Sequence, residues 1–327
     1  MQPYNFEAEA TPTGPVKTCL IFLGGAGLNV ATHLLDLPNV HCIDTCDKNI
    51  VDAHRKAKVF LTKGTRGAGK NRAFILPKIR PQLDDIMASI PEADFYIVTY
   101  SLGGGSGSVL APLVKSRLAA RKASFVSFVI GATESTEVLQ NDIDTMKSLE
   151  SIAVRSGTPI VVNYTPNVNG QSFEFTNKQI AANIRRVVCL TNQNHARLDV
   201  HDVNNWVRFT DKHKNLIPQV CELHISDDRK DAELVPEPIS IASLYLDPEK
   251  EYAFNTAPVR TAGIMRNEDL DVTDEQLHFV INSIGVVEIM KGITDARTEA
   301  IRQQAKFVQR SPLLAPDDVS DEDGMVV

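Results

Sequence analysis

The sequence has few cysteines, few aromatic residues and no long hydrophobic run. Its five cysteines are an odd number, at positions 19, 42, 46, 189 and 221, and their spacing is not that of a metal site. We therefore expect reduced, buried thiols, as in a cytoplasmic protein. No apolar run is long enough to span a bilayer, and residues 1–15 lack the basic start and apolar core of a signal peptide. We expect neither secretion nor a membrane span.

The chain also lacks an excess of positive charge. Its formal net charge is -7, which predicts no strong attraction to nucleic acid or to an anionic membrane. Five acidic residues near the end carry much of that charge, so the rest of the chain stands at -2, which is -7 plus 5. They are Asp317, Asp318, Asp321, Glu322 and Asp323. The segment 317–327 is therefore an acidic tail, and its last three residues are apolar.

What the sequence contains is a series of short apolar runs with helical stretches between them. With 43% hydrophobic and 23% charged residues, it has the composition of a globular protein. Nearly continuous apolar runs predict strands buried on both faces, as in a parallel sheet. The runs are 18–23, 40–43, 95–100, 125–130 and 159–163. Residues 109–121 and 137–155 suit crossover helices, so the predicted fold is a doubly wound α/β sheet, which binds ligands at the carboxyl ends of its strands.

A long helix and a smaller α+β region are predicted to follow. Apolar residues at helical spacing indicate a central helix over 177–191 and a shorter helix over 202–212. Beyond them we expect strands and two further helices. The strands are 219–225, 239–246, 259–266 and 286–290, and the helices are 272–284 and 298–309.

Two glycine-rich loops follow apolar strands, where backbone N–H groups can approach phosphate oxygens. The first includes Gly24, Gly25, Ala26 and Asn29. Alone, this segment fits either a tight turn between strand and helix or a dinucleotide fingerprint, in which Asp44 would bind a ribose. A nicotinamide-dependent oxidoreductase therefore stays open as an alternative.

The second glycine loop is the stronger indication. It consists of Gly103, Gly104, Gly105, Ser106 and Gly107, with another serine at position 108. Consecutive glycines destabilise ordinary structure, so we interpret the loop as an anion site at the N-terminus of a helix rather than as a hinge between domains. Two such loops from neighbouring strands predict a phosphate chain bound from two sides.

A third loop, residues 64–71, nearly matches the P-loop pattern GxxxxGK[ST]. Asn71 stands where a Ser or Thr would bind magnesium, and Pro77 is expected to cut short a helix that follows. We therefore predict a further phosphate-facing loop that includes Ala68, Gly69 and Lys70 rather than a true P-loop. A flexible surface loop is the alternative.

Asp199 and Asp202 lie three residues apart after the central helix. One interpretation is a helix cap, with Asp202 at the N-terminus of the next helix. The other is a carboxylate pair that orients a water molecule or a cation. The spacing alone leaves both open.

Together these motifs resemble the tubulin/FtsZ superfamily of filament-forming GTPases, and within it the bacteriophage-encoded tubulin-like proteins (PhuZ-type). The run 103–108, GGGSGS, is similar to the GGGTGSG signature, with Ser for Thr and no final Gly. The first loop, Asp44 and the segment 67–71 match the other nucleotide loops in order. The resemblance implies four parts. They are a GTP-binding domain over 1–174, the central helix over 175–192, a C-terminal domain over 193–297 with a catalytic loop at 193–202, and a helix and acidic tail over 298–327.

The resemblance also implies roles for single residues around a guanine nucleotide. Glu137 would contact the ribose, and Asn163 would hydrogen-bond guanine at the end of a strand. At the start of the central helix, Phe173 would stack on guanine and Asn177 would hydrogen-bond it. The cofactors would be GTP or GDP, with Mg²⁺ held through the phosphates and not by side chains.

Asp199 and Asp202 match an acidic loop of that superfamily whose carboxylates serve hydrolysis. Arg197 replaces the usual Asn just before the pair, so a relative that binds nucleotide without hydrolysing it stays open. A central helix of about 15 residues separates its ends by about 22 Å. The two carboxylates would then lie beyond reach of their own chain's γ-phosphate. Head-to-tail polymerisation would instead complete the hydrolytic site on a neighbouring subunit.

Partners and setting are implied in the same way. The chain itself is the expected partner, with the acidic tail docked on a neighbouring subunit near basic residues such as Arg185, Arg186 or Arg302. We expect no direct contact with nucleic acid and no membrane. The family implies a filament in the cytoplasm of an infected bacterium that positions phage DNA. The alternative, an NAD-dependent oxidoreductase of Rossmann type, does not explain the run 103–108 and has no clear site for hydride transfer.

Overall fold

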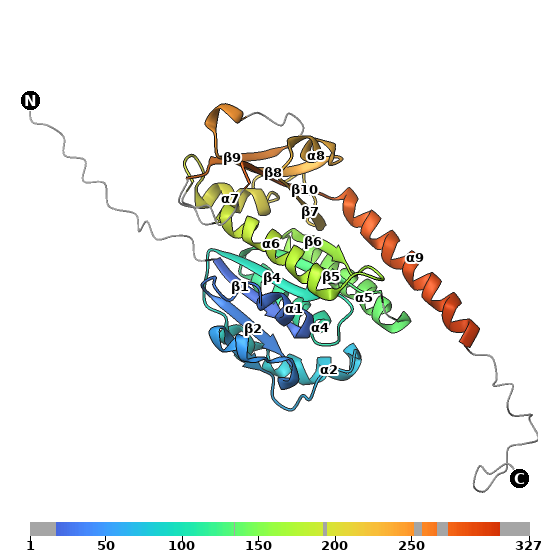
Figure 1. The fold of residues 1–327 in the computed structure, drawn as a ribbon. Helices are drawn as coiled ribbons and strands as arrows, with labels where there is room; N and C mark the ends of the chain where they lie inside the picture. The colour runs from blue at the N-terminus through green and yellow to red at the C-terminus, as the bar shows by residue number, and fades with distance from the viewer. Residues whose placement is uncertain (1–17, 134, 192–194, 252–256, 267–273, 308–327) are drawn as a thin grey trace, which may run out of the picture.

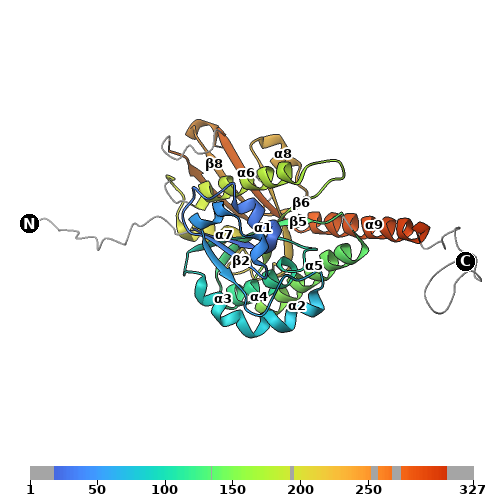
Figure 2. The same cartoon turned by 60° about the horizontal axis from the view of Figure 1, so that its bottom comes forward.

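The computed structural model describes residues 18–133, 135–191, 195–251, 257–266 and 274–307 of the 327-residue chain. One ten-stranded sheet runs through these residues, with helices on both faces (Figures 1 and 2). The order in the sheet is β3-β2-β1-β4-β5-β6-β7-β10-β8-β9. The strands are β1 (Thr18–Leu23), β2 (Val40–Asp44), β3 (Lys58–Leu61), β4 (Phe95–Ser101), β5 (Ser124–Gly131), β6 (Ile160–Pro166), β7 (Val220–Ser226), β8 (Pro238–Tyr245), β9 (Val259–Ile264) and β10 (Gln276–Asn282).

The strands from β3 to β6 form the parallel part of the sheet. Each of the five strands predicted from an apolar run is confirmed there. Strands β1, β4 and β5 are buried along almost their whole length, which explains their continuous apolar character. Strand β3 was not predicted, because it is a four-residue edge strand whose residues are mostly exposed.

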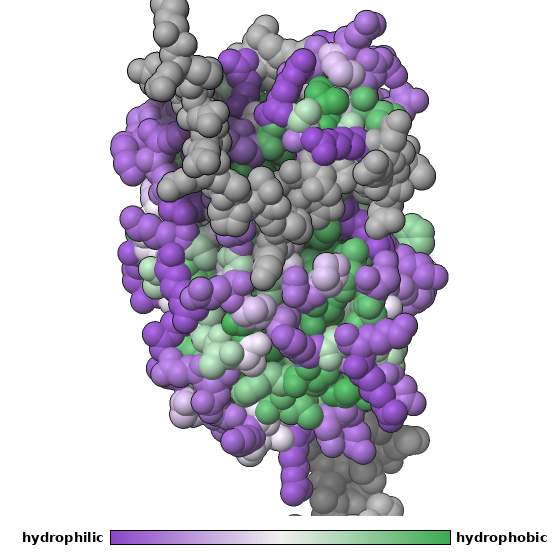
Figure 3. Space-filling view, turned by 90° about the vertical axis from the view of Figure 1, so that its left-hand side faces the viewer, coloured by the Kyte–Doolittle hydropathy of each residue, from purple (hydrophilic) through white to green (hydrophobic). Residues whose placement is uncertain are grey.

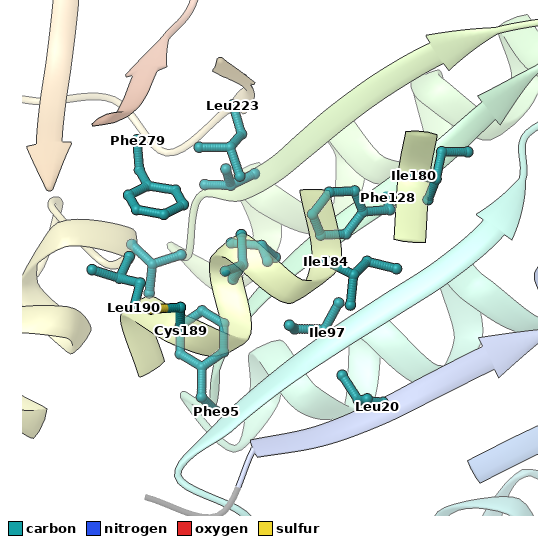
Figure 4. Close-up of a cluster of buried hydrophobic side chains, with 14 of the residues drawn as sticks. Leu20, Phe95, Ile97, Phe128, Ile180, Ile184, Cys189, Leu190, Leu223 and Phe279 are labelled. Atoms are coloured by element: carbon teal, nitrogen blue, oxygen red, sulfur yellow. The ribbon is translucent and has the colours of Figure 1, made fainter. Parts of the chain in front are cut away.

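Helices enclose the sheet from two sides, and alternate residues of the strands enter two hydrophobic cores. On one face, Leu20 and Ile97 pack beneath Ile184 of α6 (Figure 4). On the other, Ile21 and Val98 pack against α4 and α5. The predicted doubly wound α/β fold is therefore confirmed. The helices are α1 (Gly24–Ala31), α2 (Arg72–Ile79), α3 (Leu83–Ser89), α4 (Gly107–Ala120), α5 (Thr136–Ser156), α6 (Phe173–Thr191), α7 (Val200–Val207), α8 (Arg229–Leu234) and α9 (Ile284–Phe307).

The predicted crossover helices and central helix are also confirmed, with shifted ends. Helix α4 begins at Gly107 rather than at position 109, and α6 begins at Phe173 rather than at position 177. The short helix expected over 202–212 is α7, which begins at Val200 and ends at Val207. Helix α2 continues past Pro77 to Ile79, so the proline shortens this helix less than expected.

The C-terminal strands continue the same sheet, because β7 pairs with β6 in parallel and β10 joins β7 and β8 in antiparallel fashion. The helix predicted over 272–284 is wrong, since its described part contains β10. The interior position of β10 between two strands buries both of its faces, and a short apolar run does not distinguish such a strand from a buried helix.

The strand predicted over 286–290 is also wrong, because these residues belong to α9. Ile289 and Ile293, four residues apart, are buried in the core that α5 also lines. The final helix predicted over 298–309 is therefore the second half of a longer helix, whose described part ends at Phe307. Figure 1 shows α9 extending away from the body of the molecule.

Two further expectations concern cysteines and membranes. Cys19, Cys42, Cys189 and Cys221 are buried and free, as predicted, whereas Cys46 is half-buried. Within the part of the chain that the structure describes, no helix has the length and apolar character needed to cross a membrane.

Candidate nucleotide site

The three glycine-containing loops meet at the carboxyl edge of the parallel sheet. The first begins α1 directly after β1, and the second leads from β4 into α4. Gly24 adopts φ +72°, and a Cβ there would lie 2.8 Å from the Gly107 nitrogen. A Cβ on Gly105 would lie 2.5 Å from the Ala68 Cβ and 2.8 Å from the Lys70 nitrogen, in the third loop. Glycine is required at these positions because the backbones nearly touch.

Polar side chains tie the loops together. The hydroxyl oxygens of Thr45, which follows β2, and Ser106 are 2.6 Å apart, and the Gly67 N–H donates to the Thr45 carbonyl at 3.0 Å. The Asn141 amide, on α5, donates to the carbonyls of Lys70 (2.7 Å) and Gly103 (3.2 Å). The loops are therefore held by neighbours that the sequence analysis did not single out.

Two helix N-termini, with the backbone N–H groups of their first turns, lie at this edge, although the N–H groups of Ser108 and Val109 in α4 already donate to the carbonyls of Gly104 and Ser106. Helices α1 and α4 both begin within the glycine loops, and neither has an acidic residue in its first turn. The helix dipole and these N–H groups favour a bound anion. The edge therefore has the chemistry of a phosphate-binding site formed from two sides, as the loop spacing predicts.

Asp44 is placed differently from a ribose-binding acid. It is fully buried, and its carboxylate accepts hydrogen bonds from the Thr45 N–H (2.6 Å) and the Asn49 amide (2.5 Å). Because this carboxylate is enclosed and engaged, the structure disfavours the nicotinamide alternative. The Asn49 amide lies 2.8 Å from where a Cβ of Gly25 would stand, beside the first loop. Asn49 was missed, although its position five residues after the acid could have indicated it.

The third loop is not a P-loop. Asn71 is the N-cap of α2 and accepts a hydrogen bond from the Phe74 N–H at 2.9 Å. Its side-chain oxygen therefore caps a helix rather than standing free for a metal. Gly69 and Lys70 both have positive φ, at 54° and 60°, so the chain turns sharply where it meets Gly105.

A lysine behind the glycine loop is excluded as a phosphate ligand. Lys115 is fully buried on α4, and its ammonium group is 2.5 Å from the Tyr100 hydroxyl. Burial lowers the pKa of Lys115 well below its ordinary value. Its side chain belongs to the core beneath α4 and does not reach the loops.

Of the residues expected to hold the base and ribose, Phe173 and Glu137 lie in the first turns of helices at this edge. Asn163 lies within β6, which continues to Pro166 rather than ending at position 163. Asn163 in β6 donates to the Leu223 carbonyl at 2.8 Å, and its buried Oδ1 has no hydrogen-bond partner among the described residues. Phe173 is 59% exposed and begins α6, and Asn177 is nearly buried one turn later. Glu137 is exposed in the first turn of α5. An unpaired buried amide oxygen is an acceptor for a ligand N–H group.

An open groove of about 520 Å³ runs between α2, α4 and α5. Glu137, Asn71 and Ser108 line it together with Arg72 and Asn141. Among the described residues, no group of three or more His, Cys, Asp or Glu side chains could hold a metal ion. Binding of Mg²⁺ through the phosphates stays a prediction.

Asp199 and Asp202 lie at the opposite edge of the sheet. The Thr18 hydroxyl, at the start of β1, is 2.8 Å from the Thr191 hydroxyl at the end of α6. Ser124, at the start of β5, bonds to Asn204 of α7 at 2.5 Å. The 19 residues of α6 span about 27 Å, so the structure does not bring these carboxylates to the glycine loops.

The two aspartates form a reciprocal cap of α7. Asp199 is the N-cap, and its Oδ1 accepts from the Asp202 N–H at 3.0 Å. Asp202 Oδ2 accepts from the Asp199 N–H at 3.2 Å. The cap interpretation is confirmed, although Asp199 and not Asp202 is the capping residue. The neighbouring Arg197 has φ 67°, and its guanidinium pairs with Glu251 at 2.7 Å.

Comparisons with known proteins show what this chain is similar to. A family model described as the C-terminal domain of phage tubulin-like protein matches residues 198–286. A phage tubulin-like protein of Pseudomonas phage 201phi2-1 is 68% identical over 96% of this chain and 100% of its own length. That of Pseudomonas phage PhiPA3 is 46% identical over 95% of this chain and 99% of its own length.

Solved structures extend the similarity to the fold. A GDP structure of the phage tubulin PhuZ matches with a TM-score of 0.90 at 68% identity, covering 96% of this chain and 100% of that chain. A PhuZ filament matches with a TM-score of 0.88, also at 68% identity and with the same coverage. An FtsZ of M. jannaschii, at 18% identity and a TM-score of 0.60 over 82% of this chain and 90% of that chain, shares the fold.

Proposed function

This chain belongs to the family of phage tubulin-like proteins, and on that premise we propose that it is a GTPase that assembles head to tail into filaments. The observation that carries the proposal is that the phosphate-binding loops and the Asp199–Asp202 pair occupy opposite edges of one sheet. Two related structures support it, since one contains GDP and the other is a filament.

In this proposal the carboxyl edge binds GTP or GDP. Backbone N–H groups of the three loops and of the α1 and α4 N-termini would hold the phosphates. The unpaired Asn163 oxygen would accept from guanine, Asn177 would bond to the base, and exposed Phe173 would stack on it. Glu137 would accept from a ribose hydroxyl. Mg²⁺ bound through the phosphates would neutralise developing charge on their oxygens.

Hydrolysis is assigned to the contact between two subunits. Asp199 and Asp202 of one subunit would orient the attacking water at the γ-phosphate of the next subunit's nucleotide. Phosphoryl transfer depends mainly on such positioning and on charge stabilisation. Because a head-to-tail contact uses two different surfaces, it repeats without closing and gives an open filament.

Both edges carry exposed apolar side chains that suit such a contact. At the carboxyl edge these are Phe173, Phe175 and Val168, each more than half exposed. At the opposite edge Ile217 is 70% exposed. It is placed at this edge by Gln219, two residues later, whose carbonyl accepts a hydrogen bond from the N–H of Ile160 at the start of β6. Figure 3 views that end and shows an apolar area bordered by hydrophilic residues. Stacking of subunits would remove both apolar areas from water.

The setting follows from the family. We place the filament in the cytoplasm of an infected bacterium, where it would position phage DNA without binding nucleic acid or membrane directly. Docking of the acidic tail on a neighbour stays a prediction, because residues 317–327 lie outside the described ranges. All three basic residues named for the tail are paired within the chain. Arg185 and Arg186 pair with Asp36 and with Asp227 and Asp274 at 2.7–3.1 Å, whereas Arg302 pairs with Glu299 at 3.8 Å and is 72% exposed, which makes it the more available.

The test compares two substitutions of Asp202. Asp202→Asn keeps an oxygen that accepts from the Asp199 N–H and so retains the cap, while it removes the charge. We expect it to keep GTP binding and filaments and to lower GTP turnover by about 100-fold or more. Asp202→Ala would also lose the reciprocal bond from the Asp199 N–H, while the N-cap bond of Asp199 to the backbone of residue 202 remains, so we expect an added loss of at most about 1 kcal/mol of stability.

The wild-type protein provides the second readout. Turnover per subunit should rise steeply as the protein concentration passes the assembly threshold. A constant rate through the threshold, or unchanged turnover in Asp202→Asn, would contradict catalysis between subunits. Nucleotide binding without phosphate release at any concentration would identify the chain as a non-hydrolysing relative.

A further inference from the structure

One buried carboxyl group links two loops that border the candidate nucleotide site. Asp142 lies on α5 and is fully buried. Its Oδ2 accepts a hydrogen bond from the N–H of Ala132, which directly follows β5, at 2.9 Å. Its Oδ1 has no hydrogen-bond partner in the part of the chain that the structure describes. Burial of an unpaired carboxylate oxygen is costly, and protonation lowers that cost because it removes the charge.

The unpaired oxygen of Asp142 lies against the first residue of the triple-glycine loop. A Cβ on Gly103 would lie 2.6 Å from that oxygen and 2.5 Å from the Val138 Cγ1. Because Gly103 has no side chain, the space beside it is available for the carboxyl group of Asp142. The same side chain thus contacts the loop after β4 and the backbone after β5, both at the carboxyl edge of the sheet.

The surroundings of Asp142 favour the neutral acid. Burial raises its pKa to about 7, and the hydrogen bond from Ala132 only partly opposes this. The titratable group that faces it from a neighbouring strand is Tyr164 of β6, whose pKa is raised by its own burial and then by Asp142. Gly103 and Ala132 themselves carry no charged side chain. No cation is among the groups that shift the pKa of Asp142, so ionisation would leave a carboxylate without a compensating charge.

We propose that Asp142 is a positioning residue of the nucleotide site: its protonated form holds the triple-glycine loop and the segment after β5 in the arrangement that binds the nucleotide, and its ionised form does not. This inference rests on the proposed nucleotide binding. Ionisation would draw water or donors toward the bare oxygen and displace the Gly103 loop. Bound phosphates would repel the ionised form, so nucleotide binding would in turn favour proton uptake by Asp142.

The experiment measures GDP affinity by calorimetry at about pH 6 and about pH 8, below the assembly threshold, for the wild type and for Asp142→Asn. The Asn side chain keeps an acceptor for the Ala132 N–H and cannot ionise. With a pKa near 7, the neutral fraction of Asp142 falls about tenfold across this range. Between about pH 6 and about pH 8, we expect the GDP affinity of the wild type to fall about tenfold more than the GDP affinity of Asp142→Asn falls. Titration of GDP itself changes both affinities equally and does not contribute to this difference.

Asp295→Asn, an exposed carboxyl group on α9, is the matched control and should behave as the wild type. Equal pH dependence in the wild type and Asp142→Asn would overturn the role of Asp142. Absence of GDP binding at both pH values in every variant would instead overturn the proposed function, and this inference with it.

A second measurement needs no substitution. Infrared spectra of the wild type should contain a carboxylic acid C=O band that disappears as the pH rises through about 7 and persists to higher pH with GDP bound. This readout stays informative if Asp142→Asn fails to fold. A carboxyl group that is already ionised at about pH 6 would overturn the proposal.

Discussion

Replacement of Gly105 by alanine tests the close approach of the second and third loops. The added Cβ would lie 2.5 Å from the Ala68 Cβ, 2.8 Å from the Lys70 nitrogen and 3.0 Å from the Lys70 Cα. All three neighbours are backbone or Cβ atoms, which cannot rotate away. The contact is therefore relieved only if the two loops move apart.

The size of that movement follows from the same distances. Ordinary contact for a Cβ begins at 3.4 Å, so the loops must separate by about 0.9 Å, which is 3.4 minus 2.5. Forcing an extra methyl group into a packed region costs about 1–3 kcal/mol. Misplacement of binding groups by about 1 Å also weakens what they hold, and we expect GTP affinity to fall at least about tenfold.

The assay combines urea unfolding of the nucleotide-free protein with titration by GTP. Gly104→Ala is the matched control for stability, because its Cβ would meet only Ser101, at 3.5 and 3.6 Å, which is ordinary contact. It should change the free energy of unfolding by less than about 1 kcal/mol. Wild-type stability and GTP affinity in Gly105→Ala would refute the interlocking of the two loops.

Two further predictions concern stability. Burial lowers the pKa of His278 from 6.5 to about 4, so the stability that neutral His278 contributes is fully present above about pH 6.5 and is lost as the pH falls toward about 4. Between pH 7 and pH 5 the free energy of unfolding should therefore fall by up to about 2 kcal/mol. His278→Asn should reduce this pH dependence, and a substitution of exposed His201 should not. Gly292→Ala, on an exposed turn of α9 with nothing within 4 Å of the new Cβ, should raise the free energy of unfolding by about 0.5–1 kcal/mol, and a decrease would show that α9 is not helical at this position.

The fold was predictable where burial on both faces leaves an uninterrupted apolar run. That holds for β1, β4 and β5, whose sequences have few polar residues to interrupt the apolar run. The same logic failed for β10, because an apolar run of this length is compatible with a strand and with a buried helix until its neighbours are known. The position of β10 between β7 and β8 depends on pairing between segments far apart in the sequence, which a local pattern of residues does not reveal.

The candidate site divides in a similar way. Glycine loops could be predicted, because a run such as 103–105 has few other physical explanations. The side chains that hold the loops could not, since Asn141 and Asp142 lie far from them in sequence and meet them only through the packing of α5. Asp44 as a nucleotide ligand stays a prediction. Its spacing fits a ribose-binding acid, while its burial and its hydrogen bond from Asn49 could not be predicted from the sequence.

The cap formed by Asp199 and Asp202 does not compete with a role in hydrolysis. The cap uses one oxygen of each carboxylate, Oδ1 of Asp199 and Oδ2 of Asp202, and leaves the second oxygen of each outside it. A cap alone would be served equally by Ser or Asn, which carry no charge. Two carboxylates locked to the same helix end have fixed positions before any partner arrives, and that preorganisation is what orienting a water molecule requires. Asp202→Asn would distinguish the cap from the proposed role in hydrolysis, because it keeps the bond from the Asp199 N–H and removes the charge.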